Sequence, residues 1–215
     1  DWLIASGFPE FTPVDEAYND FPVEFDREVD FEDMAVFGEF TYRLTDRLQV
    51  TAGLRVFKQD FEQEVVYRFP YCSFFCAADG EDLLGSTQVR TEQDFDDHLI
   101  KLNASYDISP DHMIYFTFSE GFRHGGANSL PASGPFAVES ELLSYQPDEV
   151  DNWEVGIKGY LADKSISYSA NLFRADWDNI QLDTFLGLLL MPAVANGESA
   201  ISQGFETEVN ASLTD

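Results

Sequence analysis

Residues 151–177, DNWEVGIKGYLADKSISYSANLFRADW, alternate apolar and polar side chains, turn, and then alternate again. The apolar set of the first half is Trp153, Val155, Ile157, Gly159 and Leu161. Because successive side chains of a β-strand face opposite sides of the sheet, this pattern predicts a strand with one apolar face. The turn at 162–164 and the renewed alternation over 166–172 then predict an antiparallel hairpin.

The same alternating unit recurs along the chain. Further alternating segments lie at 36–44, 48–56, 100–108, 114–118 and 205–213. Turns of two to four residues follow some strands, whereas long connections, roughly 66–93, 124–146 and 186–200, follow the others. The sequence therefore predicts about seven antiparallel strands in up-and-down order, with short turns at one end and long loops at the other.

Two all-β architectures fit this pattern. A soluble sandwich, such as a carbohydrate-binding domain, also alternates apolar and polar residues. A transmembrane β-barrel is favoured because the middles of the apolar faces carry no charge. The charged residues on these faces, Glu120 and Arg174, lie only near the loop ends. In addition, the segments approach the nine to eleven residues of a spanning strand, and the opposite face is rich in Ser, Thr, Asn and Gly, as suits a wet or plugged lumen.

Composition excludes several functional classes. The net charge of −28 excludes ordinary nucleic-acid binding, which requires clustered Lys and Arg. The longest apolar run, FLGLLLMPAVA at 185–195, is shorter than the ~18 residues of a spanning helix and contains Pro192. Because the chain begins at Asp1 rather than Met, we expect a mature protein or a piece of a longer one.

Several stretches resemble one membrane-protein family. They are VFGEFTYRLTDRLQVTAGLRV (36–56), DHMIYFTFSEGFRHGGAN (111–128), residues 145–181 and ANGESAISQGFETEVNASLTD (195–215). Their order and spacing are similar to those in the barrel of TonB-dependent outer-membrane receptors. The sequence departs from the family pattern at His124, where Pro is usual, and at Asp148, where Glu is usual.

The resemblance implies a 22-stranded barrel in the bacterial outer membrane, filled by a plug that couples uptake to the TonB complex. We therefore expect a fragment, with an extracellular loop region at 1–33 and a partial barrel at 34–215, and with the plug and TonB-contacting segment elsewhere. The implied function is energy-coupled uptake of a scarce ligand, foremost a ferric siderophore. The alternatives are a passive porin-like or adhesin-like barrel and a receptor for cobalamin or an oligosaccharide.

A membrane position also assigns the apolar face of the strands to lipid. Trp153, Phe122, Tyr42 and Tyr106 lie near predicted strand ends, where interfacial aromatic residues are common. Outer-membrane lipid is therefore an expected partner, and nucleic acid is not.

The candidate ligand-binding residue is Arg123. It shares the lumen-facing parity of Tyr115, Thr117 and Ser119 and stands where the predicted strand gives way to a long loop. A guanidinium there is suited to grip carboxylate or catecholate oxygens, although the alternative is that Arg123 only neutralises nearby carboxylates. The flanking candidates are His124, Asn128 and Tyr145.

The remaining chemically active residues give weaker signals. Cys72 and Cys76 lie in a predicted loop, and the oxidising outer face of the envelope favours a disulfide over a metal pair. The three histidines show no metal-binding spacing, no haem-receptor signature is recognisable, and no enzyme signature is present; we expect no catalytic role, cofactor or metal centre. The acidic stretches DFDD (94–97) and DWDN (176–179) are expected on a solvated surface, with divalent-cation binding as the alternative.

Overall fold

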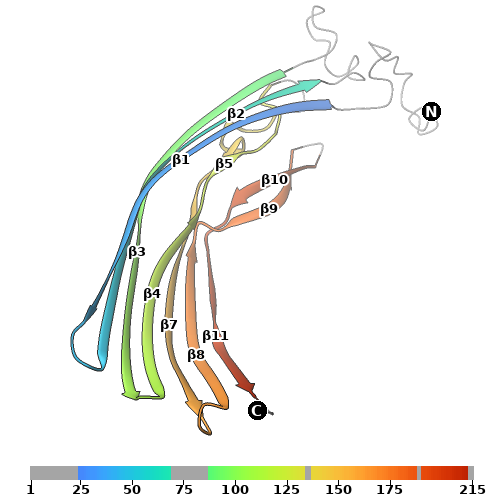
Figure 1. The fold of residues 1–215 in the computed structure, drawn as a ribbon. Helices are drawn as coiled ribbons and strands as arrows, with labels where there is room; N and C mark the ends of the chain where they lie inside the picture. The colour runs from blue at the N-terminus through green and yellow to red at the C-terminus, as the bar shows by residue number, and fades with distance from the viewer. Residues whose placement is uncertain (1–23, 69–86, 134–136, 188–189, 213–215) are drawn as a thin grey trace, which may run out of the picture.

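The computed structural model describes residues 24–68, 87–133, 137–187 and 190–212. Its main element is a curved, antiparallel, seven-stranded sheet with the strand order β1-β2-β3-β4-β7-β8-β11 (Figure 1). The strands are β1 (Glu24–Arg43), β2 (Leu48–Arg68), β3 (Thr87–Ser109), β4 (His112–Arg123), β7 (Asp148–Leu161), β8 (Ile166–Asp178) and β11 (Ser199–Ala211). The predicted all-β, antiparallel up-and-down piece of about seven barrel strands is confirmed. Its closure into a 22-stranded barrel stays a prediction.

Four shorter strands form two small hairpins outside this sheet. In one, β5 (Gly126–Ala127) pairs with β6 (Ser144–Tyr145), with a short 3-10 turn at Ser140–Leu142 between them. In the other, β9 (Gln181–Leu186) pairs with β10 (Met191–Asn196). Within the described ranges, no helix is long and apolar enough to cross a membrane.

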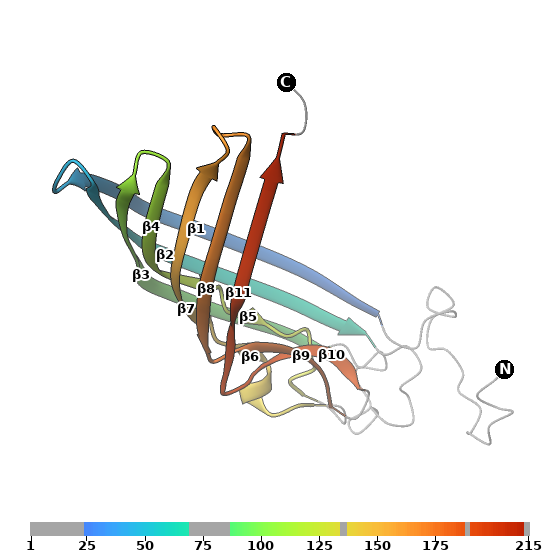
Figure 2. The same cartoon turned by 90° about the horizontal axis from the view of Figure 1, so that it is seen from below.

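Short and long connections alternate as the sequence predicts. The short turns span 44–47, 110–111 and 162–165, and the long connections span 69–86, 124–147 and 179–198. Figure 2 shows the three short turns at one end of the sheet and β5, β6, β9 and β10 at the other. We call these ends the short-turn rim and the long-loop rim.

The strand register joins the apolar residues into one continuous face. One row across the sheet contains Tyr42, Val50, Ala104, Phe116, Val155, Leu172 and Phe205. The adjacent row, on the opposite face, contains Thr41, Thr51, Asn103, Thr117, Glu154, Phe173 and Gly204. The predicted two-faced strands are thus confirmed.

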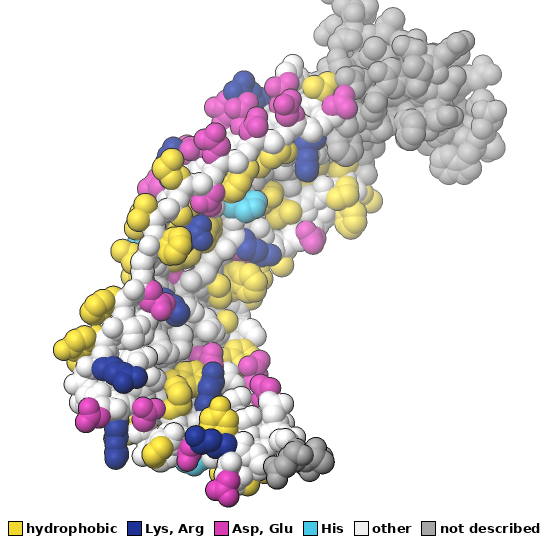
Figure 3. Space-filling view, in the orientation of Figure 1, with side chains coloured by type: hydrophobic (Ala, Val, Ile, Leu, Met, Phe, Trp, Pro, Cys, Tyr) yellow, Lys and Arg dark blue, Asp and Glu magenta, His cyan; other side chains and the backbone are white. Residues whose placement is uncertain are grey.

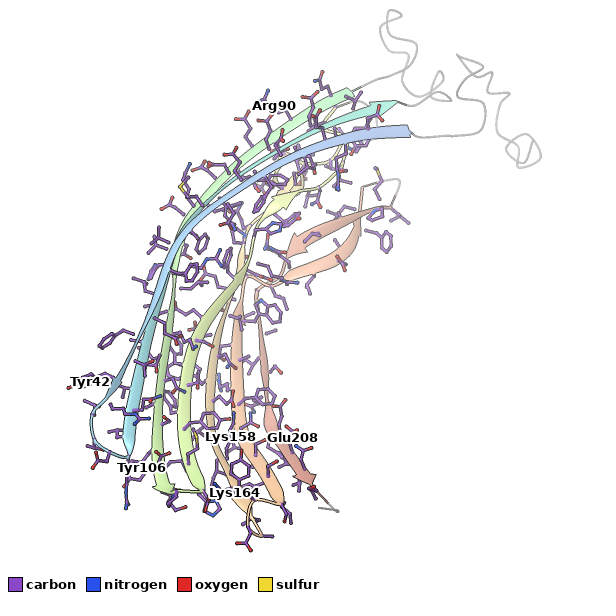
Figure 4. All side chains as sticks on the ribbon, viewed as in Figure 1. Tyr42, Arg90, Tyr106, Lys158, Lys164 and Glu208 are labelled. Carbon is purple, nitrogen blue, oxygen red and sulfur yellow. The ribbon has the colours of Figure 1, made fainter. Side chains whose placement is uncertain are left out.

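No second sheet covers the apolar face in the described part of the chain. Phe205 is 75% exposed and Leu172 is 61% exposed. Tyr42 and Tyr106 lie towards the short-turn rim (Figure 4). A soluble sandwich would bury this face against another sheet, whereas a barrel wall presents it to lipid.

The first three strands continue well beyond the rest of the sheet. Pairing between β3 and β4 ends at Lys101 and Ser119, but β2 and β3 stay paired as far as Tyr67 and Thr87. We call the extension, residues 24–38, 54–68 and 87–100, the arm. It bends over the concave side of the sheet at the long-loop rim (Figure 1).

The arm reverses the polarity of the two faces. Its inner face buries Phe57, Phe61, Val65 and Tyr67 together with Gln59 and Gln63, whereas its outer face carries Lys58 and many carboxylates. Figure 3 shows Asp and Glu side chains gathered along this upper edge of the molecule. The reversal at Val56 and Phe57 places the end of the lipid-facing band on β2.

The arm corrects three expectations. Residues 24–33, expected in a loop region, belong to β1, and β2 and β3 extend into the two ends of the expected loop at 66–93, over 66–68 and 87–93. The extracellular position of residues 1–33 stays a prediction. The sequence of the arm favours loops because acidic residues such as Asp30, Glu62 and Asp94 occupy the outer positions. Burial of the inner face of β2 stabilises the arm, and β1, whose inner Phe31 is still exposed, is held by its pairing with β2. Phe122, expected in an aromatic belt, stacks on Phe57 with ring centroids 4.3 Å apart.

Candidate functional site at the long-loop rim

The end of β4 places Arg123 at the long-loop rim, on the lumen-facing parity of the strand. Two glycines follow, and both stand where the chain is closely packed. A Cβ on Gly125 would lie 2.6 Å from the Phe95 ring and 2.7 Å from the Tyr145 carbonyl oxygen. A Cβ on Gly126 would lie 2.5 Å from the Tyr145 hydroxyl. Glycine therefore lets the 124–147 connection fold closely beneath the arm.

Arg123 forms an ion pair with Asp148, its cross-strand neighbour on β7. Its Nε donates to both carboxylate oxygens at 3.0 Å, and its Nη2 donates to Oδ2 as well. The Asp148 side chain is fully buried, and the Gln181 N–H donates to its Oδ2 at 3.0 Å. A buried carboxylate of this kind requires such a partner.

The outer side of the Arg123 guanidinium remains accessible. Its side chain is 48% exposed, and its guanidinium carbon lies 4.9 Å from the centroid of the Trp177 ring. Nη2 also donates to the Gln181 carbonyl oxygen at 3.2 Å. The hydrogen bond to Asp148 raises the pKa of Arg123, so the group stays cationic. Asp148 thus orients the guanidinium and leaves one edge of it facing solvent.

The pKa of Asp148 reflects two opposing effects. Burial raises it, but hydrogen bonds from Arg123 and from the Gln181 N–H outweigh burial and hold the pKa below its ordinary value of 3.8. A carboxyl group with a lowered pKa in the folded protein contributes stability that is present above its unfolded pKa. That contribution is lost as the pH falls through the lower folded value.

We therefore expect the backbone N–H of Gln181 to stay protected from hydrogen exchange at neutral and mildly acidic pH and to lose protection only below about pH 4. Asp148→Asn should remove this acid transition, because an amide does not titrate. Exchange rates measured over a pH series and corrected for intrinsic rates test the prediction. Loss of protection of the Gln181 backbone N–H in the wild-type protein at near-neutral pH would contradict the prediction.

His124 and Tyr145 lie near the two ends of the 124–147 connection that follows Arg123. The exposed His124 ring lies 5.1 Å from the Phe31 ring of the arm, and its Nδ1 lies 2.7 Å from the Gly125 carbonyl oxygen. Tyr145 is half-buried beside Gly126, and burial raises the pKa of its hydroxyl. Both side chains lie at the junction between the arm and the 124–147 connection.

Asn128 lies deeper than the sequence suggested. It is only 6% exposed, and its amide contacts two other segments. Nδ2 donates to the carbonyl oxygens of Leu142 at 2.9 Å and Val194 at 2.7 Å, while Oδ1 accepts from the Val194 N–H at 2.8 Å. Both amide hydrogens are therefore already used within the protein.

Sequence reasoning missed three residues that shape this rim. Asp148 was visible only as a departure from a family motif, and nothing near Trp177 or Gln181 marked them as neighbours of Arg123. Gln181 donates through Nε2 to the carbonyl oxygens of His124 and Gln146, at 2.9 and 3.0 Å. Such contacts depend on how the loops fold back on each other, and alternation does not encode that.

The other predicted sites give different outcomes. Cys72 and Cys76 lie outside the described residues, so their disulfide stays a prediction. In the stretch 176–179, Asp176 accepts hydrogen bonds from Arg174, the shortest at 2.6 Å. Across the described ranges, no three His, Cys, Asp or Glu side chains are grouped to hold a metal ion.

Comparisons with known proteins agree with the fold. The family model described as "TonB dependent receptor-like, beta-barrel" matches residues 2–214. The pesticin receptor of Yersinia pestis is 24% identical over 182 residues, which are 82% of this chain and 23% of that receptor. The pesticin receptor of Yersinia enterocolitica gives the same identity and coverage. The chain thus spans about a quarter of the length of these relatives.

Solved structures show the same fold at low sequence identity. The ferric yersiniabactin uptake receptor FyuA of Yersinia pestis is 18% identical, with a TM-score of 0.69 over 89% of this chain and 26% of its own. The closed form of the ferric-catecholate import receptor Fiu of E. coli K12 is 16% identical, with a TM-score of 0.59 over 87% of this chain and 26% of its own.

Proposed function

Because this chain belongs to the TonB-dependent receptor β-barrel family of the bacterial outer membrane, we propose that it forms part of a receptor for energy-coupled uptake of a ferric siderophore. The chain contributes barrel wall and extracellular loops. TonB would act through the plug that the family resemblance implies. Two structural relatives that import ferric complexes support the choice of ligand. No catalytic role is part of the proposal.

One observation carries the choice of an anionic ligand. The sequence has a net charge of −28, which disfavours approach of an anion, yet Arg123 presents a half-exposed, fixed guanidinium at the long-loop rim. Asp148 and the Gln181 carbonyl oxygen engage the N–H groups on Nε and Nη2, so the two N–H groups on Nη1 are left to donate to the oxygens of a ferric carboxylate or catecholate complex. Asp148 holds the group in place, which lowers the entropy lost on binding.

His124 and Tyr145 complete the proposed contact surface. His124 is exposed beside Arg123, and Tyr145 is half-buried on the same connection. An imidazole and a phenol supply polar and stacking contacts to a ligand with aromatic rings. Asn128, the fourth candidate from the sequence, positions the loops and does not contact the ligand, because its amide hydrogens already bind the Leu142 and Val194 carbonyl oxygens.

The proposal predicts TonB-dependent uptake by the full-length receptor. Cells that carry it as their sole ferric receptor should accumulate radiolabelled iron from a supplied ferric catecholate or ferric carboxylate siderophore, and deletion of TonB should abolish accumulation. Surface binding should persist without TonB, because binding precedes the energy-requiring step. Uptake that continued without TonB would instead support a passive barrel.

Ligand competition separates the alternatives within the family. Excess unlabelled ferric siderophore should displace the label, whereas cobalamin and oligosaccharides should not. If cobalamin or an oligosaccharide were taken up in a TonB-dependent way and ferric complexes were not, the siderophore assignment would be wrong although the receptor assignment would stand.

A further inference from the structure

The β9–β10 hairpin projects from the sheet on its concave side, next to β5 (Figure 1). Phe185 is 66% exposed, so the hairpin presents apolar surface at the long-loop rim. A two-stranded hairpin in water is marginally stable by itself. Something must therefore hold this hairpin in place.

The outer edges of the hairpin show what holds it. In an antiparallel pair, alternate residues direct their backbone groups away from the partner strand and leave them unpaired at the edge. Gln181 on β9 and Val194 on β10 each have both their N–H and their C=O bonded by side chains from other segments. Each edge is thus closed at one point by side chains that imitate a neighbouring strand.

On the β9 edge, this role falls to the Arg123–Asp148 pair. The Gln181 N–H donates to Asp148, and the Gln181 C=O accepts from Arg123. On the β10 edge, Asn128 fulfils both functions for Val194, with donor-acceptor distances of 2.7 and 2.8 Å. Asn128 also binds the Leu142 carbonyl oxygen, and its own N–H donates to the Leu143 carbonyl oxygen at 2.8 Å. The 124–147 connection is therefore tied across its width as well as to the hairpin.

Contacts at the base of the hairpin add to these two clasps. Asn196 donates to the carbonyl oxygens of Gln146 and Asn179, at 3.0 and 2.9 Å, and its Oδ1 accepts from the Gln146 N–H at 2.7 Å. The buried amide of Asn128, with its partners in place, specifies one arrangement, because any displacement leaves backbone groups unpaired.

We propose that Asn128 is a positioning residue that, together with the Arg123–Asp148 pair, joins residues 124–133 and 137–147 to strands β9 and β10 as one rigid unit at the mouth of the barrel. A contact made with either loop is then transmitted to the other. The inference concerns the arrangement of the loops and holds whatever ligand the receptor carries.

The test uses the full-length receptor in lipid nanodiscs without ligand. Spin labels at Glu139→Cys in the connection and Phe185→Cys in the hairpin, in a Cys72→Ser and Cys76→Ser background, report the distance between the two loops. The labelled receptor that retains Asn128 should give one narrow distribution of distances between the two labels. Asn128→Asp keeps the acceptor and the shape but removes both donors, so it should broaden the distribution. Asn128→Leu, which removes all three hydrogen bonds, should broaden it further.

Two controls separate positioning from unfolding and from charge. Ser140→Asp adds the same negative charge at an exposed site of the same connection and should leave the distribution narrow. Hydrogen exchange of the Val194 amide should accelerate about tenfold in Asn128→Leu, since one hydrogen bond to a neutral group is lost. Exchange in β7 and β8 should not change.

An unchanged, narrow distribution in both Asn128 variants would overturn the proposal, as would a wild-type distribution that is already broad. Equal broadening by Ser140→Asp would also overturn it, because the cause would then be charge. The distance and exchange measurements need no siderophore. A negative result in them would therefore leave the uptake proposal standing, and a negative uptake result would leave the loop proposal standing.

Discussion

Replacement of Arg123 by alanine in the full-length receptor is expected to weaken binding of a ferric catecholate or carboxylate siderophore by about 2 kcal/mol, or about thirtyfold in Kd. The half-exposed guanidinium would no longer donate to ligand oxygens. Arg123→Lys should recover only part of the affinity, because an ammonium group cannot keep the planar fork to Asp148 that orients the donor towards the ligand. Equilibrium binding to purified receptor gives the Kd values.

The same substitution also leaves the buried Asp148 carboxylate without its cation, so structural damage must be separated from loss of contact. The double variant Arg123→Ala with Asp148→Asn removes both charges and most of that damage. If Arg123 contacts the ligand, the double variant should bind as weakly as Arg123→Ala. If Arg123 serves only to neutralise Asp148, affinity should return towards that of wild type.

The chain provides a matched control for this experiment. Arg174 also forms a forked ion pair with an aspartate, Asp176, and is similarly exposed, at 50%. It lies on the lipid-facing parity of β8, away from the lumen. Arg174→Ala should therefore leave siderophore affinity unchanged. An equal loss in both variants would show that the effect is general electrostatics and would remove Arg123 from the site.

The sequence predicted the parts of this fold that depend on local alternation. The apolar rows through Val155 and Leu172 and the lumen-facing parity of Arg123 follow from a period of two, which strand pairing preserves across the sheet. The turns at 44–47 and 162–165 were visible because the alternation stops there.

The arm and the clasped hairpin were not predictable in the same way. Alternation in the arm is obscured because Gln59 and Gln63 occupy buried inner positions usually filled by apolar residues. The segment around Leu186 read as an apolar loop, since its pairing with Met191 is held by contacts to residues far away in sequence. Asn128 lies at the rim, but its burial depends on Val194, which is 66 residues away.

A lysine in the middle of the lipid-facing band should have the largest effect on stability. Ile157 lies centrally in the apolar stretch of β7, opposite Ile114 and Ala170. Ile157→Lys should lower the free energy of unfolding of the full-length barrel in lipid by about 2–4 kcal/mol, because a charge near the bilayer midplane is not solvated. Urea titration of receptor folded into vesicles measures the change.

Met113→Lys is the matched control. Met113 is adjacent in sequence to Ile114, the partner of Ile157, so the same charge is introduced at a similar depth but on the lumen side. Met113 pairs with Lys158 on β7 and with Asp107 on β3, so a new ammonium there lies beside a carboxylate as well as a cation. The lumen admits water, and its polar side chains solvate charge, so this variant should lose less stability than Ile157→Lys. Were the two losses equal, or were the lumen variant the less stable, the apolar face of these strands would not be the one that meets lipid.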